Sequence, residues 1–154
     1  MPKRPRLCLT VFGFLVLALG VQSSRALGDH HIPAGAPLNV RTLQTLDTDS
    51  AWPGMRVEAV VDDPIDVGGR IVVPRGAPAR LEVVDVRRSS NSEDRALITL
   101  RVLWIEARNR VSSVATNGVQ FIGSSDGAGI GETHLRIPAE TRMQFQLNMC
   151  ALVE

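Results

Sequence analysis

A short motif that occurs three times constrains this sequence more than any other feature. Each copy has a β-branched residue, a proline, a small or charged residue, a turn residue and then alternating polarity, in residues 32–38, 73–79 and 137–143. Proline fixes φ near the value needed at the second position of a type I turn, and glycine is favoured at the fourth. Glu140 takes the glycine position in the third copy, which this turn type tolerates. The uneven spacing argues against a stacked repeat, so the motif predicts corners between strands of one folded sheet.

Most of the chain alternates between apolar and polar residues with the period of a β-strand. The alternation is clearest in residues 38–42, 57–61 and 143–149. A one-residue phase slip after Val83 is typical of a β-bulge, and residues 97–105 are apolar on both faces, as in a central strand. Helical periodicity is almost absent. We predict an all-β fold, a single small β-barrel or sandwich of short, mostly antiparallel strands with Pro-Gly corners.

Turn signals separate these strands. The glycine pair at 68–69 and the residue pair 109–110 indicate turns, and the polar residues 88–94 indicate an exposed hairpin loop. Asn117 followed by Gly118 predicts a two-residue hairpin. The glycine-rich residues 123–131 lack the spacing and the lysine of a phosphate-binding loop, so we interpret them as a flexible linker.

The first 26 residues have the layout of a secretory signal. A basic segment precedes an apolar run in residues 7–21, which is followed by a small-residue cleavage site ending at Ala26. The run is shorter than the roughly 20 residues of a spanning helix, which favours a cleaved signal over an uncleaved anchor. We therefore predict a signal peptide in 1–26, a flexible N-terminus in 27–31 and a β-barrel or sandwich domain in 32–154, located in the periplasm or secreted.

Charge and cysteine content narrow the class of protein. Removal of residues 1–26 takes away four basic and no acidic residues, which changes the net charge from +1 to −3. The remaining arginines are scattered among acids, so the sequence gives no basic patch for nucleic acid. One cysteine, Cys150, remains, and it has no second cysteine for a disulfide. Contact with a membrane is expected only through the signal segment, if that segment is not cleaved.

Three residues are candidates for contact with a partner or ligand. Trp52 precedes Pro53 and Gly54 in a loop; an exposed tryptophan there is a recognition anchor, whereas a packed one caps an end of the barrel. His30 and His31 lie at the expected mature N-terminus, where paired imidazoles suit Cu(II) or Ni(II). Without a third ligand at defined spacing we predict no metal site and no cofactor.

Residues with catalytic potential do not form a recognisable set. Cys150 has no base placed near it by the sequence, and we expect a small buried apolar side chain there. Asp126 lacks the residue that follows the catalytic aspartate of aspartic proteases. The acidic pairs 47/49 and 62/63 do not follow a calcium-loop pattern and are interpreted as solvated turn residues. We expect no enzyme; a hydrolase built on Asp126 or Cys150 is the least favoured alternative.

The corner motif resembles corners in the C-terminal β-barrel domain of the TrbI-like conjugation and type IV secretion scaffold proteins. Residues 68–76, a strand that leads into the second corner, and residues 45–61, with Pro53 and Gly54 before a strand, are also similar. Small exported bacterial envelope proteins that carry only this module resemble the chain still more closely. The resemblance implies a barrel-like fold, a scaffold role and no catalytic residues. The chain lacks the long proline-rich linker and apolar insertion of the secretion scaffolds, so the resemblance does not imply a channel.

The sequence therefore predicts a non-enzymatic exported module of the cell envelope with a scaffold or protein-interaction role. The expected partners are envelope proteins, the cell wall, or a second copy of the chain through sheet edges that are not closed. The alternative is a periplasmic module that binds a small ligand, a glycan or a metal ion at Trp52 or at His30 and His31.

Overall fold

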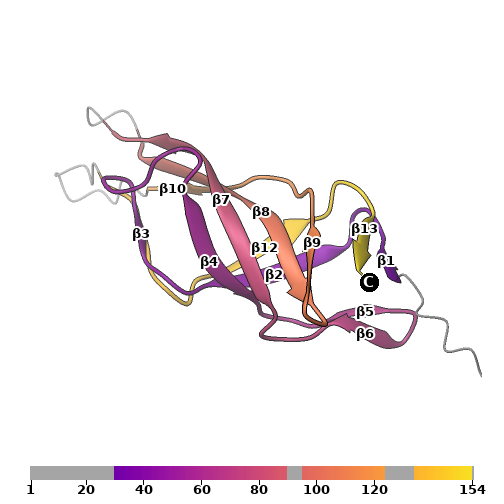
Figure 1. Ribbon diagram of the computed structural model, residues 1–154. Helices are drawn as coiled ribbons and strands as arrows, with labels where there is room; N and C mark the ends of the chain where they lie inside the picture. Colours follow the sequence, from indigo (N-terminus) through magenta and orange to yellow (C-terminus); the bar gives the residue numbers. More distant parts are fainter. Residues whose placement is uncertain (1–29, 90–94, 124–133, 154) are drawn as a thin grey trace, which may run out of the picture.

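The computed structural model describes residues 30–89, 95–123 and 134–153. These residues contain strands and no helix, which confirms the all-β prediction (Figure 1). The strands are β1 (His30–Ile32), β2 (Pro37–Thr42), β3 (Leu46–Asp47), β4 (Arg56–Val61), β5 (Ile65–Val67), β6 (Arg70–Val73), β7 (Pro78–Arg87), β8 (Leu97–Ala107), β9 (Arg110–Ser113), β10 (Val119–Ile122), β11 (Arg136–Ile137), β12 (Arg142–Gln146) and β13 (Ala151–Val153).

One antiparallel sheet forms the body of the molecule. Its strand order is β10-β8-β7-β4-β2-β12, and β9 pairs with the same edge of β8 as β10 does. The sheet curls into a half-barrel (Figure 1). Its two edges meet at one end, where Thr116 forms an isolated bridge with Leu147. Three two-stranded ribbons, β1-β13, β3-β11 and β5-β6, complete the fold.

The core lies on the concave side of this sheet, and the alternation seen in the sequence sets it. In β2, β4 and β12 every second side chain is buried. The predicted central strand is β8, which is paired along both edges, and the predicted bulge appears as a register shift between Val83 and Asp85. Fully buried side chains from the main strands include Leu38, Val40, Val57, Val61, Leu81, Ile98, Leu100 and Phe145.

The three corners are real, but they are not type I turns. Proline is the first residue of each turn rather than the second. The N–H of Ala36 donates to Pro33 O and that of Ala77 to Pro74 O, both at 3.2 Å, and at the third corner Thr141 Oγ1 donates to Pro138 O at 2.7 Å. The third position has a positive φ: 81° at Gly35, 82° at Gly76 and 68° at Glu140. A positive φ at that position defines a type II turn. The glycine position therefore does restrict side chains, and Glu140 adopts a backbone conformation that non-glycine residues rarely adopt.

Each corner is also bonded to the end of a neighbouring strand by two backbone hydrogen bonds. At the first corner the N–H of Gly35 donates to Leu147 O (2.7 Å), and the N–H of Leu147 donates to Ala36 O (3.1 Å). Two residues on one strand thus oppose one residue on the other, as in a bulge with glycine at its first position. The same pattern joins the second corner to Val61 and the third to Thr42.

A fourth corner of this kind occupies residues 52–55, which the sequence did not group with the others. The N–H of Met55 donates to Trp52 O (3.0 Å), and Gly54 has a φ of 87°. Gly54 and Met55 exchange two backbone hydrogen bonds with Val83. The four corners begin β2, β4, β7 and β12. The corner before β2 is bonded to the end of β12, and the corner before β12 is bonded to the end of β2. These bonds hold β12 beside β2 although the two strands are far apart in the sequence.

Two turn predictions are wrong. Asn117 and Gly118 do not connect a hairpin, because β9 and β10 both pair with β8 and not with each other. Asn117 instead bonds the backbone of Gln146: its N–H donates to Gln146 O (3.0 Å), and its Oδ1 accepts from the Gln146 N–H (2.7 Å). The turn between β8 and β9 is formed by Arg108 and Asn109, both with positive φ, and not by residues 109–110. The predicted turn at Gly68 and Gly69, between β5 and β6, is confirmed.

The chain ends of the described part differ from the prediction. His30 and His31 belong to β1, which pairs with β13 in the register His30 to Val153, and the rest of the predicted N-terminus at 27–31 lies outside the described residues. The last alternating segment stops earlier than predicted, since β12 ends at Gln146 and Met149 is exposed. The predicted signal peptide, most of the predicted loop at 88–94 and most of the predicted linker at 123–131 lie outside the described residues.

Candidate functional site

A buried carboxylate on the polar side of the sheet is the centre of the most distinctive polar site. Asp62 directly follows β4, and its N–H donates to Asn39 O on β2 at 2.8 Å. This bond extends the pairing of β2 with β4 by one residue beyond Val61. It holds the Asp62 side chain over β2, away from solvent. Only 3% of the Asp62 side chain is exposed. A buried charge is costly unless it is paired, and Asp62 is paired.

Three arginines from three separate segments surround this carboxylate. Nε of Arg142 on β12 lies 3.0 Å from Asp62 Oδ2, and Nη2 of Arg75 at the second corner lies 3.4 Å from Oδ1. Nε of Arg41 on β2 is also 3.4 Å from Oδ1, within ion-pair range, although it makes no hydrogen bond. Arg41 is further paired with Glu140 at the third corner. We call these five residues the Asp62 cluster.

The strand register explains why a carboxylate is needed there. Arg41 and Arg142 are directly opposite each other on β2 and β12. Like charges in that position repel each other, and Asp62 lies between them from the adjacent strand. The cluster therefore connects β4, β2 and β12 on the polar side of the sheet, at the point where two corners meet. The Asp62 cluster therefore holds these three strands together.

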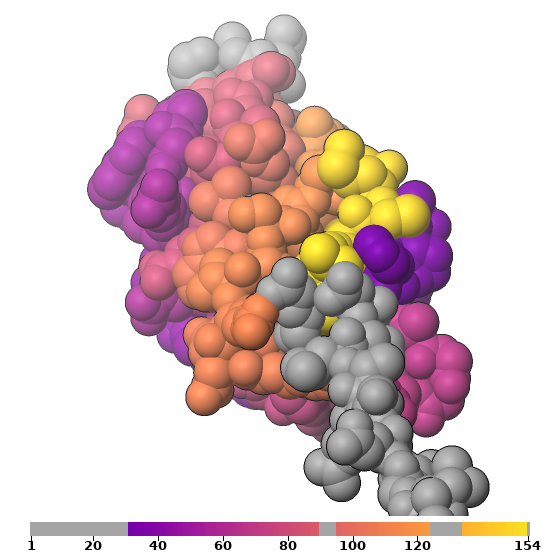
Figure 2. Space-filling model, turned by 45° about the vertical axis from the view of Figure 1, so that its right-hand side comes forward, coloured from indigo at the N-terminus to yellow at the C-terminus, as the bar shows by residue number. Residues whose placement is uncertain are grey.

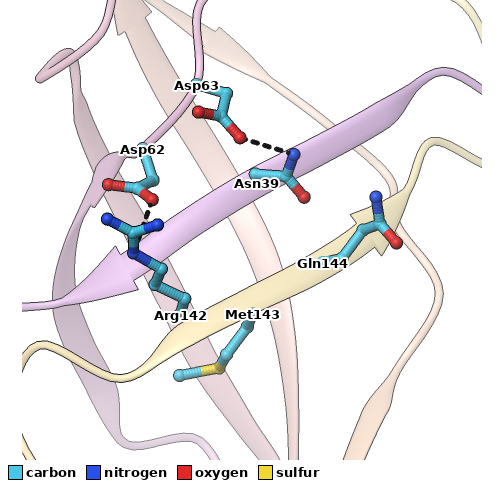
Figure 3. Close-up of a pocket in the computed structure, with 6 residues that line it drawn as sticks. All are labelled: Asn39, Asp62, Asp63, Arg142, Met143 and Gln144. Carbon is cyan, nitrogen blue, oxygen red and sulfur yellow. Dashed lines mark hydrogen bonds and ion pairs between the residues drawn. The ribbon is translucent and has the colours of Figure 1, made fainter.

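A shallow pocket of about 310 Å³ lies beside the cluster (Figure 3). In it the Nδ2 of Asn39 donates to Asp63 Oδ2 at 2.9 Å, and the Gln144 side chain extends from the next strand. Amide, carboxylate and guanidinium groups provide donors and acceptors for a polar ligand. The described residues include no group of three or more His, Cys, Asp or Glu side chains placed to hold a metal ion. The pocket is lined by Asn39, Asp62, Asp63, Arg142, Met143 and Gln144.

The residues predicted as contacts from the sequence lie elsewhere. Trp52 is 59% exposed at the first position of the fourth corner, so it does not seal an end of the barrel. His31 is exposed on β1, opposite Leu152 in the ribbon with β13. Trp52 and the histidine pair belong to different elements, one beside β7 and the other beside β13. Whether any of these residues contacts a partner stays a prediction.

The other candidates change in different ways. Cys150 is exposed, not buried as expected. His134 contacts Asp49 at the surface, with 2.9 Å between Nδ1 and Oδ2. Asp62 is not the solvated turn residue that the sequence indicated. Asp126 lies outside the described residues.

An exposed strand edge forms a second candidate site. β9 and β10 lie along the outer edge of β8, and large apolar side chains are exposed on both: Val111 is 61% exposed and Ile122 is 53% exposed. Beside β9 lies β13, where Leu152 is 40% exposed. Figure 2 shows the orange strands next to the yellow C-terminal segment. A pocket of about 360 Å³ is lined by all four residues of β9 and by Leu152.

No protein-family model matches the chain, and its comparison with curated proteins gives no match. The resemblance to the TrbI-like family therefore stays a prediction from short motifs. In the part of the chain that the structure describes, no helix has the length and apolar character needed to cross a membrane.

Sequence reasoning missed both sites for a physical reason. The arginines of the Asp62 cluster are far apart in the chain, and only the pairing of β12 with β2 brings Arg142 to Asp62. A local signal existed for one member: a charged residue in the glycine position of a corner, Glu140, needs a reason to be there. The β9 edge was missed because Asn117 and Gly118 suggested that β10 would cover it.

Proposed function

We propose that this protein is a non-enzymatic module of the cell envelope that binds another protein. The observation that carries the proposal is the outer edge formed by β9 and β10, where Val111 and Ile122 are exposed. Unpaired strand edges with apolar side chains favour association with another chain. The signal-like residues 1–26 support a location outside the cytoplasm. The resemblance to secretion scaffolds agrees with a structural role.

Site-specific photocrosslinking in cells that naturally make the protein tests the binding role. The photoreactive residue is placed at Val111 or Ile122, and at Glu58 as a matched exposed control on the opposite part of the sheet. We expect one discrete protein adduct from each edge position and none from Glu58. Absence of adducts at both edge positions, or equal adducts at Glu58, would reject the proposal.

The location is tested separately by N-terminal sequencing of the full chain after expression and cell fractionation. We expect the protein in the periplasmic or secreted fraction to begin at Leu27. A chain that stays in the cytoplasm and keeps Met1 would contradict the envelope location. The crosslinking experiment would still decide whether the protein binds a partner.

A second candidate function is the binding of a small polar ligand, such as a cell-wall glycan unit, in the pocket beside Asp62. Amide groups of Asn39 and Gln144 with the Asp63 carboxylate suit hydroxyl groups that both donate and accept. Calorimetry with soluble wall glycans tests it, with Gln144→Ala as the variant. Heat that Gln144→Ala removes would support the ligand role, and no heat would reject it. Titration with Cu(II), Ni(II) and Ca²⁺ tests the metal alternative separately, and no heat would reject it.

A further inference from the structure

We propose that the free edge of β9 binds an extended polypeptide segment, which adds to the sheet as an antiparallel strand and carries an acidic residue near its C-terminal end. This inference rests on the proposed function and names the kind of partner and the way it is held. In strand addition the backbone supplies the hydrogen bonds and alternate side chains supply selectivity.

The hairpin register shows which backbone groups of β9 are available. Arg110 is opposite Ala107, next to the two-residue turn, and Ser112 is opposite Ile105. In an antiparallel hairpin with a two-residue turn, these are the pairs that exchange hydrogen bonds. The N–H and C=O of Val111 and Ser113 therefore point away from β8. In the described part of the chain, no hydrogen bond other than those of the β8–β9 ladder involves the backbone of Val111 or Ser113.

The turn holds this edge in a fixed orientation. Arg108 and Asn109 have φ values of 52° and 64°, the combination of a type I′ turn, whose twist matches that of the flanking strands. Asparagine is common in such turns, whereas arginine at a positive φ is strained. Arg108 occupies the strained position, in the turn directly before β9.

The surroundings of β9 favour a single strand over a second folded copy. Leu152 of β13 and the four residues of β9 line the same pocket, so the edge borders a hollow beside β13 and not a flat surface. β9 has four residues, whereas stable interfaces between folded proteins use roughly 20–30 residues a side. A short hollow of this size fits a segment of extended chain.

Charge sets the expected direction and composition of that segment. The lining residues include no acid, and Arg108 is exposed at the turn. A strand antiparallel to β9 has its C-terminal end at this turn, so an aspartate or glutamate there is attracted to Arg108. Apolar side chains at alternate positions of the segment pack against Val111 and Leu152.

A short blocked peptide tests the inference with the full-length protein. Its valine and threonine residues alternate, it ends in two aspartates, and binding is followed by fluorescence anisotropy. Ser113→Pro removes an N–H that faces away from β8, a position where edge strands tolerate proline. Ser113→Thr keeps the N–H and is the matched control. We expect roughly tenfold weaker binding to Ser113→Pro, from loss of a hydrogen bond and a steric clash, and little change for Ser113→Thr.

Two further measurements do not depend on the proline variant folding. A peptide N-methylated at alternate residues, so that it cannot donate to β9, is expected to lose binding to the native protein. Replacement of the two aspartates by lysines is expected to weaken binding several-fold, and Arg108→Asn, which keeps a turn-compatible residue, is expected to remove that preference. Equal binding of the N-methylated and unmodified peptides would overturn strand addition.

The remaining outcomes separate this inference from the proposed function. Crosslinked adducts at Val111 and Ile122 that persist unchanged in Ser113→Pro would reject strand addition and leave the binding role intact. Absence of all adducts would reject the binding role itself. A dimer in light scattering that Ser113→Pro dissociates, without peptide binding to the native protein, would make a second copy the occupant and overturn the inference.

Discussion

Asp62 and Arg142 form an ion pair across the width of a strand: the Asp62 carboxylate, which follows β4, lies 3.0 Å from Nε of Arg142 on β12, and β2 is the strand between β4 and β12. Ion pairs between exposed residues contribute little to stability. This pair differs because one partner is buried and because two more arginines depend on the same carboxylate. Removal of Asp62 leaves three positive charges close together at the junction of two corners.

Replacement of Asp62 by asparagine is therefore expected to lower the free energy of unfolding by about 2 kcal/mol, less than for a fully buried pair because the arginines are partly exposed. Asp63→Asn is the matched control. Asp63 is exposed and bonded to Asn39, and we expect a change of at most about 0.5 kcal/mol there. Urea unfolding of both variants measures the difference. Equal effects would show that Asp62 has no special role.

Glu140 combines an unfavourable backbone with a favourable side-chain contact. Its φ of 68° is costly for a non-glycine residue, while its carboxylate pairs with Arg41. Glu140→Ala keeps the strain and loses the pair, so we expect a loss of roughly 0.5–1 kcal/mol. Glu140→Gly relieves the strain, with an expected gain of up to about 1 kcal/mol. Thermal unfolding that ranks alanine above glycine would contradict this account.

The fourth corner is tested at Gly54, where an added Cβ meets no atom within 4 Å. Any cost of a substitution there comes from the positive φ alone. We expect Gly54→Ala to lower the free energy of unfolding by about 1–2 kcal/mol, and Gly54→Asn by less, because asparagine tolerates this conformation. Trp52→Ala, at the exposed first position, is expected to change it by less than about 1 kcal/mol. Comparable losses for Gly54→Ala and Trp52→Ala would mean that the tryptophan is packed.

Two buried threonines are expected to respond differently to the same substitution. The Oγ1 of Thr116 accepts the Val102 N–H at 3.0 Å where the sheet edges meet, so Thr116→Val leaves that N–H unpaired and costs about 1–2 kcal/mol. The Oγ1 of Thr99 is buried without a hydrogen-bond partner among the described residues. Thr99→Val is expected to be neutral or to stabilise by up to about 1 kcal/mol. Chemical denaturation of the two variants checks the sign of each effect.

Some features of this fold are predictable from the amino-acid sequence and others are not, for physical reasons. The fold class, the bulge after Val83 and the central strand were predictable, because burial of one face imposes a period of two on any strand. The turn type was not, because proline is compatible with several turn positions and only the φ of the following glycine distinguishes them. Asn117 and Gly118 gave a wrong hairpin prediction because an asparagine can form a tight turn or can bond the backbone of another strand through its side chain.

By itself the sequence determined that this protein is built from short strands, which face of the clearly alternating strands is buried and where three of the four corners lie. These properties depend on residues that are close in the sequence, so the local alternation and the repeated proline predict them. Tertiary structure decided which strands are adjacent. Only the pairing of β2 with β12 brings Arg142 to Asp62, and only the pairing of both β9 and β10 with β8 leaves Val111 and Ser113 at a free edge. Pairing of distant strands depends on backbone hydrogen bonds that every sequence can make, so it leaves no local signal.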